Sequence, residues 1–594
     1  MISIRSFDPD ATGGQRPRLL SCCPTQSLIL LIFLITLMLN TTGNSQATDS
    51  VLVKRYQVVP NLTEEEFHFY QSDFLPLSLA ERGRLSSSAF RGMPAGFYEL
   101  RYRGIDFTNP VVGFWNEQWI PHWRITHRQA DKFGSAEIID SSPPNGYKPE
   151  TKVVYFQTNL SYLDIDFAQY FTKKNYVRLG GNNFLREGPY PFGYSRIEVN
   201  TYQAQVHLEF LDRWKLDLCY WQMRHRFYMI PKDILSIRAD KFRQIGHIGW
   251  FRLAGKLSEK DSVIFTPGYT VANDDYWKAG PPARDMWYEW GSGELSYYRK
   301  FSQGFFGARV NGRHIAIHGK RLFFDKKEGD GSALLFGEWH PGHLELEVQA
   351  GGYKHTELGE GRQIALHAAV RSKPFGRIGM RLFSKPQSVP LTWRTIEHDS
   401  IPAFGVENLM KKQGASFYAE KNFGNRFWIH VEPFAYRMTN YPVLADNIWK
   451  TQTVENYGLH FFAGLRVWRL WLQNDFTYNR NYEKSFAPEV NNVSSIKSSF
   501  SLFKGALKIE GILTGHVLSY YRLLEFDRLL QNYRITEDQV GPDYLSDFKL
   551  QLRFRRFTLF MVWENLLSED FSIVEGTLTQ FRLFNFGLQW LLFN

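Results

Sequence analysis

Apolar residues occupy every second position in three successive stretches near the C-terminus, at 548–554, 557–563 and 584–592. A period of two is the repeat of a β-strand with one apolar and one polar face. A soluble sandwich rarely ends in so aromatic a strand, whereas a membrane barrel must pair its last strand with its first to leave no edge in lipid. The pattern therefore favours a barrel, closed by the strand that contains Phe586, Gly587, Leu588 and Trp590.

The same alternation begins near residue 151 and continues to the end of the chain. Its clearest example is 202–210, where we expect Ala204, Val206, Leu208 and Phe210 to face lipid and Gln203, Gln205, His207 and Glu209 to face the lumen. Each run has about 10 residues, the length of a tilted membrane strand. The count of runs predicts an all-β fold, a transmembrane antiparallel β-barrel of about 18 strands. The polar stretches 270–291 and 479–499 are predicted to be extracellular loops.

The N-terminus has the features of an export signal. Arg5, Arg16 and Arg18 precede an apolar run at 28–39 that is too short to anchor in a bilayer, since a spanning helix needs about 20 residues. Small residues at Ser45 and Ala47 fit a cleavage site. We therefore expect residues 1–47 to be a signal peptide and the mature chain to begin at 48.

Residues 48–149 lack sustained alternation and are rich in Pro, Gly and Ser. A short helix is expected at 77–85, and a strand at 98–102 is expected to run into a turn at Gly104. This segment is predicted to be a small N-terminal plug-like α+β domain, followed by a barrel over 150–594.

Composition supports a barrel over a helical membrane protein. Hydrophobic residues make up 43% of the chain and mean hydropathy is −0.34, while aromatic residues reach 16%. Barrels combine modest hydropathy with aromatic girdles at both membrane interfaces. An aromatic-rich soluble β enzyme or sugar-binding domain would share this composition. The net charge of +10 comes without a Lys/Arg stripe, so no nucleic-acid partner is expected. Only Cys219 lies beyond the signal segment, which leaves no disulfide framework.

Two groups of residues resemble a known family. Phe90-Arg91-Gly92, the stretch 102–110 and Trp119-Ile120-Pro121 resemble the plug of TonB-dependent receptors, and Arg91, Gly92, Gly104, Pro110 and Pro121 are the positions that match. Arg103 departs from the pattern, because the family usually has Asp or Asn there. Residues 562–567 and the closing strand resemble the family's last strands and those of porins from Bacteroidetes-type bacteria. Residues 49–53 resemble a TonB box.

The resemblance implies an outer-membrane β-barrel channel or transporter for small-molecule uptake in the bacterial cell outer membrane. The implied partners are outer-membrane lipid, the barrel assembly machinery, a small-molecule solute and TonB. No catalytic or cofactor motif is visible. Asp164 and Asp166 are best interpreted as lumen carboxylates, and His340 and His343 flank a Pro-Gly turn rather than a metal site. The alternative is an outer-membrane barrel with an enzymatic or adhesive role. The sequence names no solute and leaves an open porin and a coupled receptor both possible.

Overall fold

The structure is a computed structural model of the chain. It describes residues 64–77, 87–102, 105–114, 125–130, 135–140, 149–158, 160–190, 193–231, 240–278, 282–319, 325–395, 408–424, 426–445, 448–527, 532–569, 573–574 and 582–592. The predicted signal peptide, the TonB-box-like stretch, Gly104 and Pro121 lie outside these residues. Among the described residues, no helix has the length and apolar character needed to cross a membrane.

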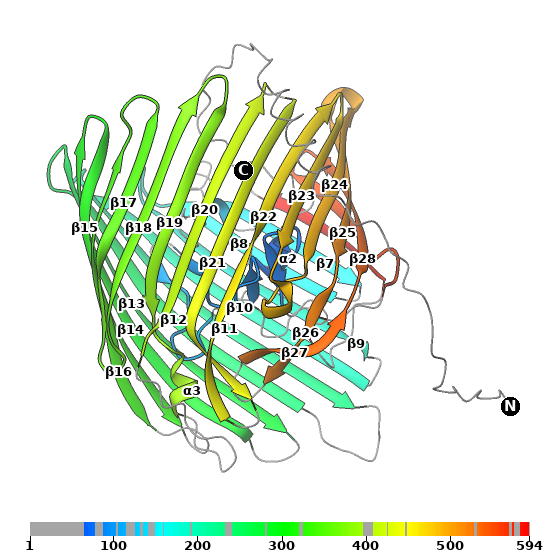
Figure 1. The fold of residues 1–594 in the computed structure, drawn as a ribbon. Helices are drawn as coiled ribbons and strands as arrows, with labels where there is room; N and C mark the ends of the chain where they lie inside the picture. The colour runs from blue at the N-terminus through cyan, green and yellow to red at the C-terminus, as the bar shows by residue number, and fades with distance from the viewer. Residues whose placement is uncertain are drawn as a thin grey trace.

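Twenty-two antiparallel strands of the described chain form one closed barrel (Figure 1). The predicted fold class is confirmed, but the prediction of about 18 strands is wrong. The strands are β7 (Glu150–Thr158), β8 (Leu160–Tyr170), β9 (Tyr176–Tyr190), β10 (Gly193–Phe210), β11 (Trp214–Pro231), β12 (Asp240–Lys256), β13 (Asp261–Lys278), β14 (Pro282–Phe301), β15 (Gly304–Gly319), β16 (Lys326–Trp339), β17 (Leu344–His355), β18 (Gly359–Ser372), β19 (Gly376–Gln387), β20 (Met410–Phe423), β21 (Phe427–Ala445), β22 (Ile448–Val467), β23 (Leu470–Asn479), β24 (Val490–Leu502), β25 (Leu507–Leu518), β28 (Asp543–Phe554), β29 (Phe557–Glu564) and β30 (Leu583–Leu592).

The barrel closes where its last strand meets its first. β30 pairs with β7, and the register places Gly587 opposite Phe156 and Trp590 opposite Val153. A Cβ at Gly587 would lie 2.5 Å from the carbonyl oxygen of Tyr155, so only glycine lets the two strands approach this closely there. Because both strands are fully paired on their neighbours, the described barrel has no free edge.

The two ends of the barrel differ. At one end, the short-turn end, every connection has five residues or fewer, and the barrel's first and last residues lie there. At the other, the loop end, longer connections carry α3 (Leu391–Thr395) and the hairpin β26 (Tyr521–Asp527) and β27 (Asn532–Val540). The predicted loop at 270–291 is wrong: these residues continue β13 and β14 to a short connection at the loop end. The predicted loop at 479–499 is shorter than expected, since β24 begins at Val490.

Exposed apolar side chains form a band around the outside, adjacent to the short-turn end. One aromatic row lies at that end and includes Phe210, Phe301, Trp339, Trp468, Phe503, Phe554 and Trp590. A second row of tyrosines lies further along the strands and includes Tyr202, Tyr220, Tyr269 and Tyr457. Two aromatic girdles that enclose an apolar band are the signature of a barrel in a bilayer. Beyond the second row, the strands continue toward the loop end.

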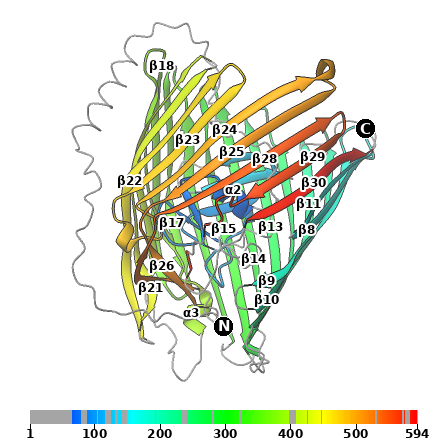
Figure 2. The same cartoon turned by 90° about the vertical axis from the view of Figure 1, so that its right-hand side faces the viewer.

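The N-terminal segment folds inside the barrel, where both views show its blue elements enclosed by the strands (Figures 1 and 2). It consists of α2 (Glu64–Phe69), β1 (Phe74–Pro76), β2 (Ser88–Phe90), β3 (Glu99–Tyr102), β4 (Ile105–Asp106), β5 (Ile125–Ala130) and β6 (Ser135–Asp140). β1 and β2 form a hairpin-like pair, and the others form a sheet in the order β4-β3-β6-β5. The predicted helix at 77–85 lies almost wholly outside the described residues. Segment and wall share one core, as where Phe107 packs on Trp221 with ring centroids 5.5 Å apart.

Candidate functional site

Arg91 joins the N-terminal segment to the barrel wall. A turn at 91–92 with positive φ at both residues directs its side chain outward, and the guanidinium is buried. Its Nε lies 2.9 Å from Oδ1 of Asp73 in the same segment, and its Nη2 lies 2.9 Å from Oε2 of Glu432 on β21. Its Nη1 donates to the Tyr436 hydroxyl at 3.2 Å, and the Phe434 ring lies 4.8 Å away. The cation is therefore enclosed by two carboxylates and by the rings of Phe90, Phe434 and Tyr436.

The backbone of the same turn is clamped by the wall. Asn456 donates from Nδ2 to the Arg91 carbonyl at 2.8 Å, and the Phe486 amide donates to the Gly92 carbonyl at 2.9 Å. A Cβ at Gly92 would lie 2.6 Å from the Asn456 amide nitrogen, and φ at Gly92 is +77°. Both the close approach and the left-handed backbone therefore require glycine at this position.

Electrostatics hold Arg91 in its charged form. Burial by itself would lower the pKa of the guanidinium, but the carboxylates of Asp73 and Glu432 outweigh burial and raise the pKa well above its ordinary value. A buried cation with two carboxylate partners is strongly destabilised when either partner is removed. The contact of Arg91 with Asp73 and Glu432 is therefore expected to form or break as one unit.

His430, Glu432 and His460 are close enough to hold a metal, with ligand atoms within 4.8 Å of one another. The arrangement does not fit one. Both oxygens of Glu432 already accept from guanidiniums, Oε2 from Arg91 and Oε1 from Arg381 at 2.9 Å. Nδ1 of His460 lies 3.3 Å from Nη2 of Arg91. A divalent cation would have to displace two fixed positive charges, so the group is better described as part of the Arg91 contact.

Lys412 on β20 makes the second buried contact with the segment. Its ammonium donates to the carbonyls of Gly96 and Phe97 at 2.7 and 3.0 Å and lies 3.1 Å from the Glu99 carboxylate. Burial alone would raise the pKa of Glu99, but Lys412, assisted by Lys385 and Arg101, lowers it to about 2. Glu99 is therefore ionised at neutral pH and fixes the start of β3 to the wall.

Three further contacts extend this attachment around the wall. Ser72 donates to Asp475 on β23 at 2.6 Å, and Asn491 on β24 donates to the Ser72 carbonyl at 2.9 Å. The Lys549 ammonium on β28 lies 2.9 Å from the Glu66 carboxylate. From β20 to β28 the segment therefore meets the wall through buried polar contacts, and we call this part of the interface the anchored side.

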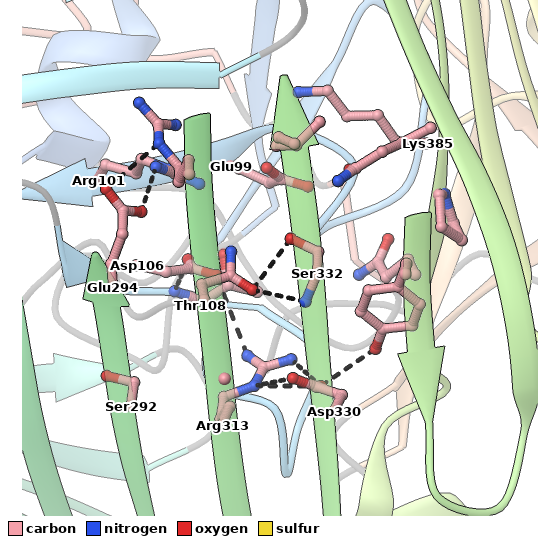
Figure 3. A pocket seen from close by; sticks show the side chains of 18 of the residues that line it. Glu99, Arg101, Asp106, Thr108, Ser292, Glu294, Arg313, Asp330, Ser332 and Lys385 are labelled. Atoms are coloured by element: carbon pink, nitrogen blue, oxygen red, sulfur yellow. Dashed lines mark hydrogen bonds and ion pairs between the residues drawn. The ribbon is translucent and has the colours of Figure 1, made fainter. Parts of the chain in front are cut away.

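A cavity of about 610 Å³ separates the segment from the opposite wall. Its floor is formed by residues of 99–113, and its wall by inward-facing residues of β13 to β19. We call this part of the interface the cavity side. Figure 3 shows Glu99, Arg101, Asp106 and Thr108 on the segment facing Glu294, Arg313, Asp330 and Ser332 on the wall.

Ion pairs line the cavity without filling it. Arg101 pairs with Glu294 at 3.2 Å, and Arg313 pairs with Asp330 at 2.6 Å (Figure 3). Arg309 also lies against Glu294, at 3.3 Å. Between Arg313 and Asp106 of the segment the distance is 4.0 Å. Burial and the neighbouring Glu99 raise the pKa of Asp106. The ion pairs of Arg101 and Asp106 thus join the segment to this wall, the second of them long, and Asn109 adds a hydrogen bond from Nδ2 to the Tyr288 hydroxyl on β14 at 3.1 Å.

No family model and no curated protein sequence matches the chain. Solved structures do. The siderophore receptor PirA from Acinetobacter baumannii superposes with a TM-score of 0.72 at 10% identity, covering 90% of this chain and 96% of that chain. A mutant of the ferric enterobactin receptor PfeA from Pseudomonas aeruginosa gives 0.72 at 11% identity, with 90% and 96% coverage. The FrpB iron transporter from Neisseria meningitidis gives 0.70 at 10% identity, with 89% and 96% coverage. The chain has the plug-and-barrel fold of these proteins.

The segment inside the barrel is thus the plug of this fold, and the matching motif residues occupy distinct places in it. Arg91 and Gly92 form the turn of the anchored side. Pro110 lines the cavity, and its carbonyl accepts from the Leu391 amide of α3 at 3.3 Å. No structural role can be given to Gly104 and Pro121, which lie outside the described residues.

On β10, Gln203 and Gln205 are buried, whereas Tyr202 is 54% and Phe210 41% exposed. His207 and Glu209 lie on the same face as the two glutamines and are half-buried, with His207 Nδ1 2.7 Å from Asp217. None of these four residues lines the cavity between the plug and β13 to β19. The residues that do bind the plug, above all Glu432 and Lys412, were not singled out from the sequence. Their only signal was a charged residue at an inward-facing strand position.

Proposed function

We propose that the chain is an outer-membrane transporter that takes up a small molecule through a barrel whose plug blocks the lumen until it is displaced. The observation that carries this proposal is that the plug contacts the two sides of the barrel wall differently. Buried ion pairs fix it on the anchored side, while a polar cavity of about 610 Å³ runs beside it on the cavity side. An enzyme would need a converging catalytic set in such a cavity, and the cavity's charged groups are instead paired with one another.

The difference between the barrel's ends supports an orientation. Outer-membrane barrels have short periplasmic turns and longer extracellular loops. The short-turn end is therefore proposed to face the periplasm, with the apolar band beside it in the bilayer. The loop end, with α3 and the β26–β27 hairpin, then faces outward, where α3 touches the plug at Pro110 and Val111.

Displacement of the plug requires an energy source. Breaking a buried ion pair by removing one partner costs about 3–5 kcal/mol, and the plug has at least two such contacts, at Arg91 and Lys412. Thermal fluctuation would open such a plug rarely. TonB acting on the stretch at 49–53, which resembles a TonB box, is the proposed source. The structural neighbours are named for siderophores and iron, so ferric siderophores are the first solutes to test.

The proposal is tested by conductance in planar lipid bilayers. The full mature chain is compared with a variant that lacks residues 48–149. A barrel of this size encloses a water-filled lumen once it is empty, so we expect small or no steps from the full chain and large steps from the deletion. Large steps of equal size from both proteins would show an open porin and overturn the proposal. Heat-modifiable gel mobility of both proteins controls for a folded barrel.

A further inference from the structure

The cavity between the plug and the wall carries more carboxylates than cations. Among the described residues that line it, the carboxylates are Glu99, Asp106, Glu294, Asp330, Glu338 and Glu347. The cations are Arg101, Arg309, Arg313 and Lys385. A cleft lined by an excess of one sign of charge concentrates solutes of the opposite sign. The cavity is therefore expected to attract positively charged solutes and to repel anions.

The acidic excess lies toward the short-turn end of the cavity. Glu338 is the last residue but one of β16, and the register sets it directly opposite Glu347 of β17. His340 lies 2.9 Å from the Glu338 carboxylate, and Gln349 donates to Glu347 at 3.2 Å. Like charges that face each other across two strands destabilise a sheet. A cation held between these two carboxylates would relieve that repulsion.

Aromatic rings beside this pair of carboxylates add to the preference for a cation. Phe305 of β15 lies directly opposite Glu338, and Phe336 lies two positions before Glu338 on the same face of β16. The Arg309 guanidinium carbon lies 5.2 Å from the centre of the Phe336 ring. The face of an aromatic ring attracts a cation at such a distance. The wall thus already holds one cation in the way in which it would hold a cationic solute.

The other end of the cavity presents uncharged polar groups. Nε2 of Gln363 on β18 and Oε1 of Gln387 on β19 are buried in the cavity lining, and neither atom has a hydrogen-bond partner among the described residues. One atom is a donor and the other an acceptor, and a hydroxyl group can pair with either. Because His367 lies opposite Glu347, Gln363 is four positions, or about 13 Å of strand, from the acidic pair.

We propose that the cavity takes a small organic cation that also carries hydroxyl groups. Its hydroxyls would lie at Gln363 and Gln387, and its cationic group between Glu338 and Glu347. With the loop end facing outward, the acidic pair draws the positive group along the cavity toward the periplasm. A ferric siderophore meets this requirement only as a complex without net negative charge. The inference names the solute class of the proposed transporter and rests on that proposed function.

The test compares two thiol reagents of similar size and opposite charge, the trimethylammonium-ethyl and the sulfonato-ethyl methanethiosulfonates. The full mature chain contains only Cys219, which is buried, so wild type gives the blank. Q349C places a thiol in the cavity, two positions from Glu347. Each rate is divided by the rate of the same reagent with 2-mercaptoethanol, an uncharged thiol. At low ionic strength we expect the corrected rate of the cationic reagent to exceed that of the anionic reagent at least tenfold.

Two triple variants locate the source of this preference. Q349C/E338Q/E347Q should lower the ratio of the two rates at least threefold. Q349C/E360Q/E455Q is the matched control, because it removes two exposed carboxylates that do not line the cavity, and it should keep the ratio. A ratio of one or less in Q349C, equal ratios in the two triple variants, or no reaction with either reagent would overturn the proposal.

Competition tests the solute class directly. Millimolar glucosamine, a hydroxylated cation, should slow the reaction of Q349C with the cationic reagent at least threefold, whereas glucose, which is uncharged and of nearly the same size, should not. Equal slowing by both sugars, or no slowing by glucosamine, would overturn the proposal. The conductance of the barrel without its plug does not depend on this charge preference. That measurement therefore separates failure of the cation proposal from failure of the transporter proposal, and heat-modifiable mobility controls for folding of every variant.

Discussion

The plug meets the two halves of the barrel wall in opposite ways. On the anchored side, Arg91 and the backbone around Gly96 are gripped by buried groups of β20–β22 at ordinary hydrogen-bond distances. On the cavity side, the wall charges pair mainly with each other, and the plug reaches them through Arg101 at 3.2 Å and Asp106 at 4.0 Å. One interface is closely packed, and the other encloses a cavity of about 610 Å³ with polar and charged lining residues.

This difference suggests where a passage opens. Separating the anchored side breaks several desolvated contacts at once, each of which leaves a charge without its partner. Widening the cavity side breaks one partly exposed ion pair and one long ion pair, which contribute little. It also breaks neutral hydrogen bonds, from Asn109 to the Tyr288 hydroxyl and from α3 to the carbonyls of Pro110 and Val111, but leaves no buried charge without its partner. A plug that pivots on its anchored side would therefore open a passage along β13 to β19 at much lower cost than a plug that leaves the barrel.

The largest expected effect on plug docking comes from removal of the buried Arg91 cation. Arg91→Ala removes the buried cation that Asp73 and Glu432 share, leaves Glu432 with Arg381 as its remaining guanidinium partner, and should reduce the free energy of plug undocking by about 3–5 kcal/mol. The matched change on the cavity side, Arg101→Ala, should cost about 1 kcal/mol or less. The urea midpoint for the appearance of large conductance steps measures both, because the midpoint at constant slope reports stability. Equal midpoints for the two variants would contradict the distinction between the two sides.

Introducing a bulky residue should produce a smaller difference in plug-docking stability between the anchored side and the cavity side. Thr477→Trp forces a large ring into the buried contact with Ser72 and should destabilise plug docking by about 1–3 kcal/mol. Ser332→Trp places the same ring in the cavity and should leave the urea midpoint within about 0.5 kcal/mol of wild type. If the cavity is the passage, Ser332→Trp should nevertheless slow uptake of a transported solute. Normal uptake by a folded Ser332→Trp protein would show that the solute does not pass through this cavity.

The smallest effect is a dependence on pH. The pKa of Glu99 is about 2 in the folded protein, below its ordinary value of 4.5. Its contribution to plug docking is therefore fully present above about pH 4.5 and is lost as the pH falls through 2. Asp106, whose pKa is raised, acts in the opposite direction. The urea midpoint of wild type should fall between pH 5 and pH 3 by more than that of Glu99→Gln. An identical fall in both proteins would assign the pH dependence to other carboxyl groups.

The sequence was sufficient for the barrel and its closing strand, because the period-two alternation is strongest where one face meets lipid. The sequence-based count of strands was too low because the alternation is weak where neither face of a strand meets lipid. Beyond the tyrosine row both faces of a strand meet water, so the contrast between apolar and polar positions fades although the hydrogen-bonded ladder continues. Residues 270–278 and 282–291 look like loop by composition and are paired residue by residue in β13 and β14.

The site was only half accessible from the sequence. Arg91 and Gly92 could be found because they belong to a short motif that resembles the plug of a known family, and the structure shows a turn with positive φ at both residues. Their partners could not, since Glu432 and Asn456 lie 341 and 365 positions away and reach Arg91 only after the barrel closes. Similarly, the cavity depends on the position of the plug relative to the barrel wall, and no short stretch of residues encodes that position.

The seam between β7 and β30 sets an order of events in folding. These strands are separated by more than 400 residues, and closing so long a flexible loop costs roughly 5 kcal/mol in chain entropy by logarithmic scaling. Pairing at such separation is slow, so the seam should be among the last contacts to form. A plug enclosed by a continuous wall cannot enter sideways afterwards. Entry through an open end of the barrel remains as the other route. If docking onto β20–β22 precedes closure, the Arg91 contact holds the unclosed sheet around the plug.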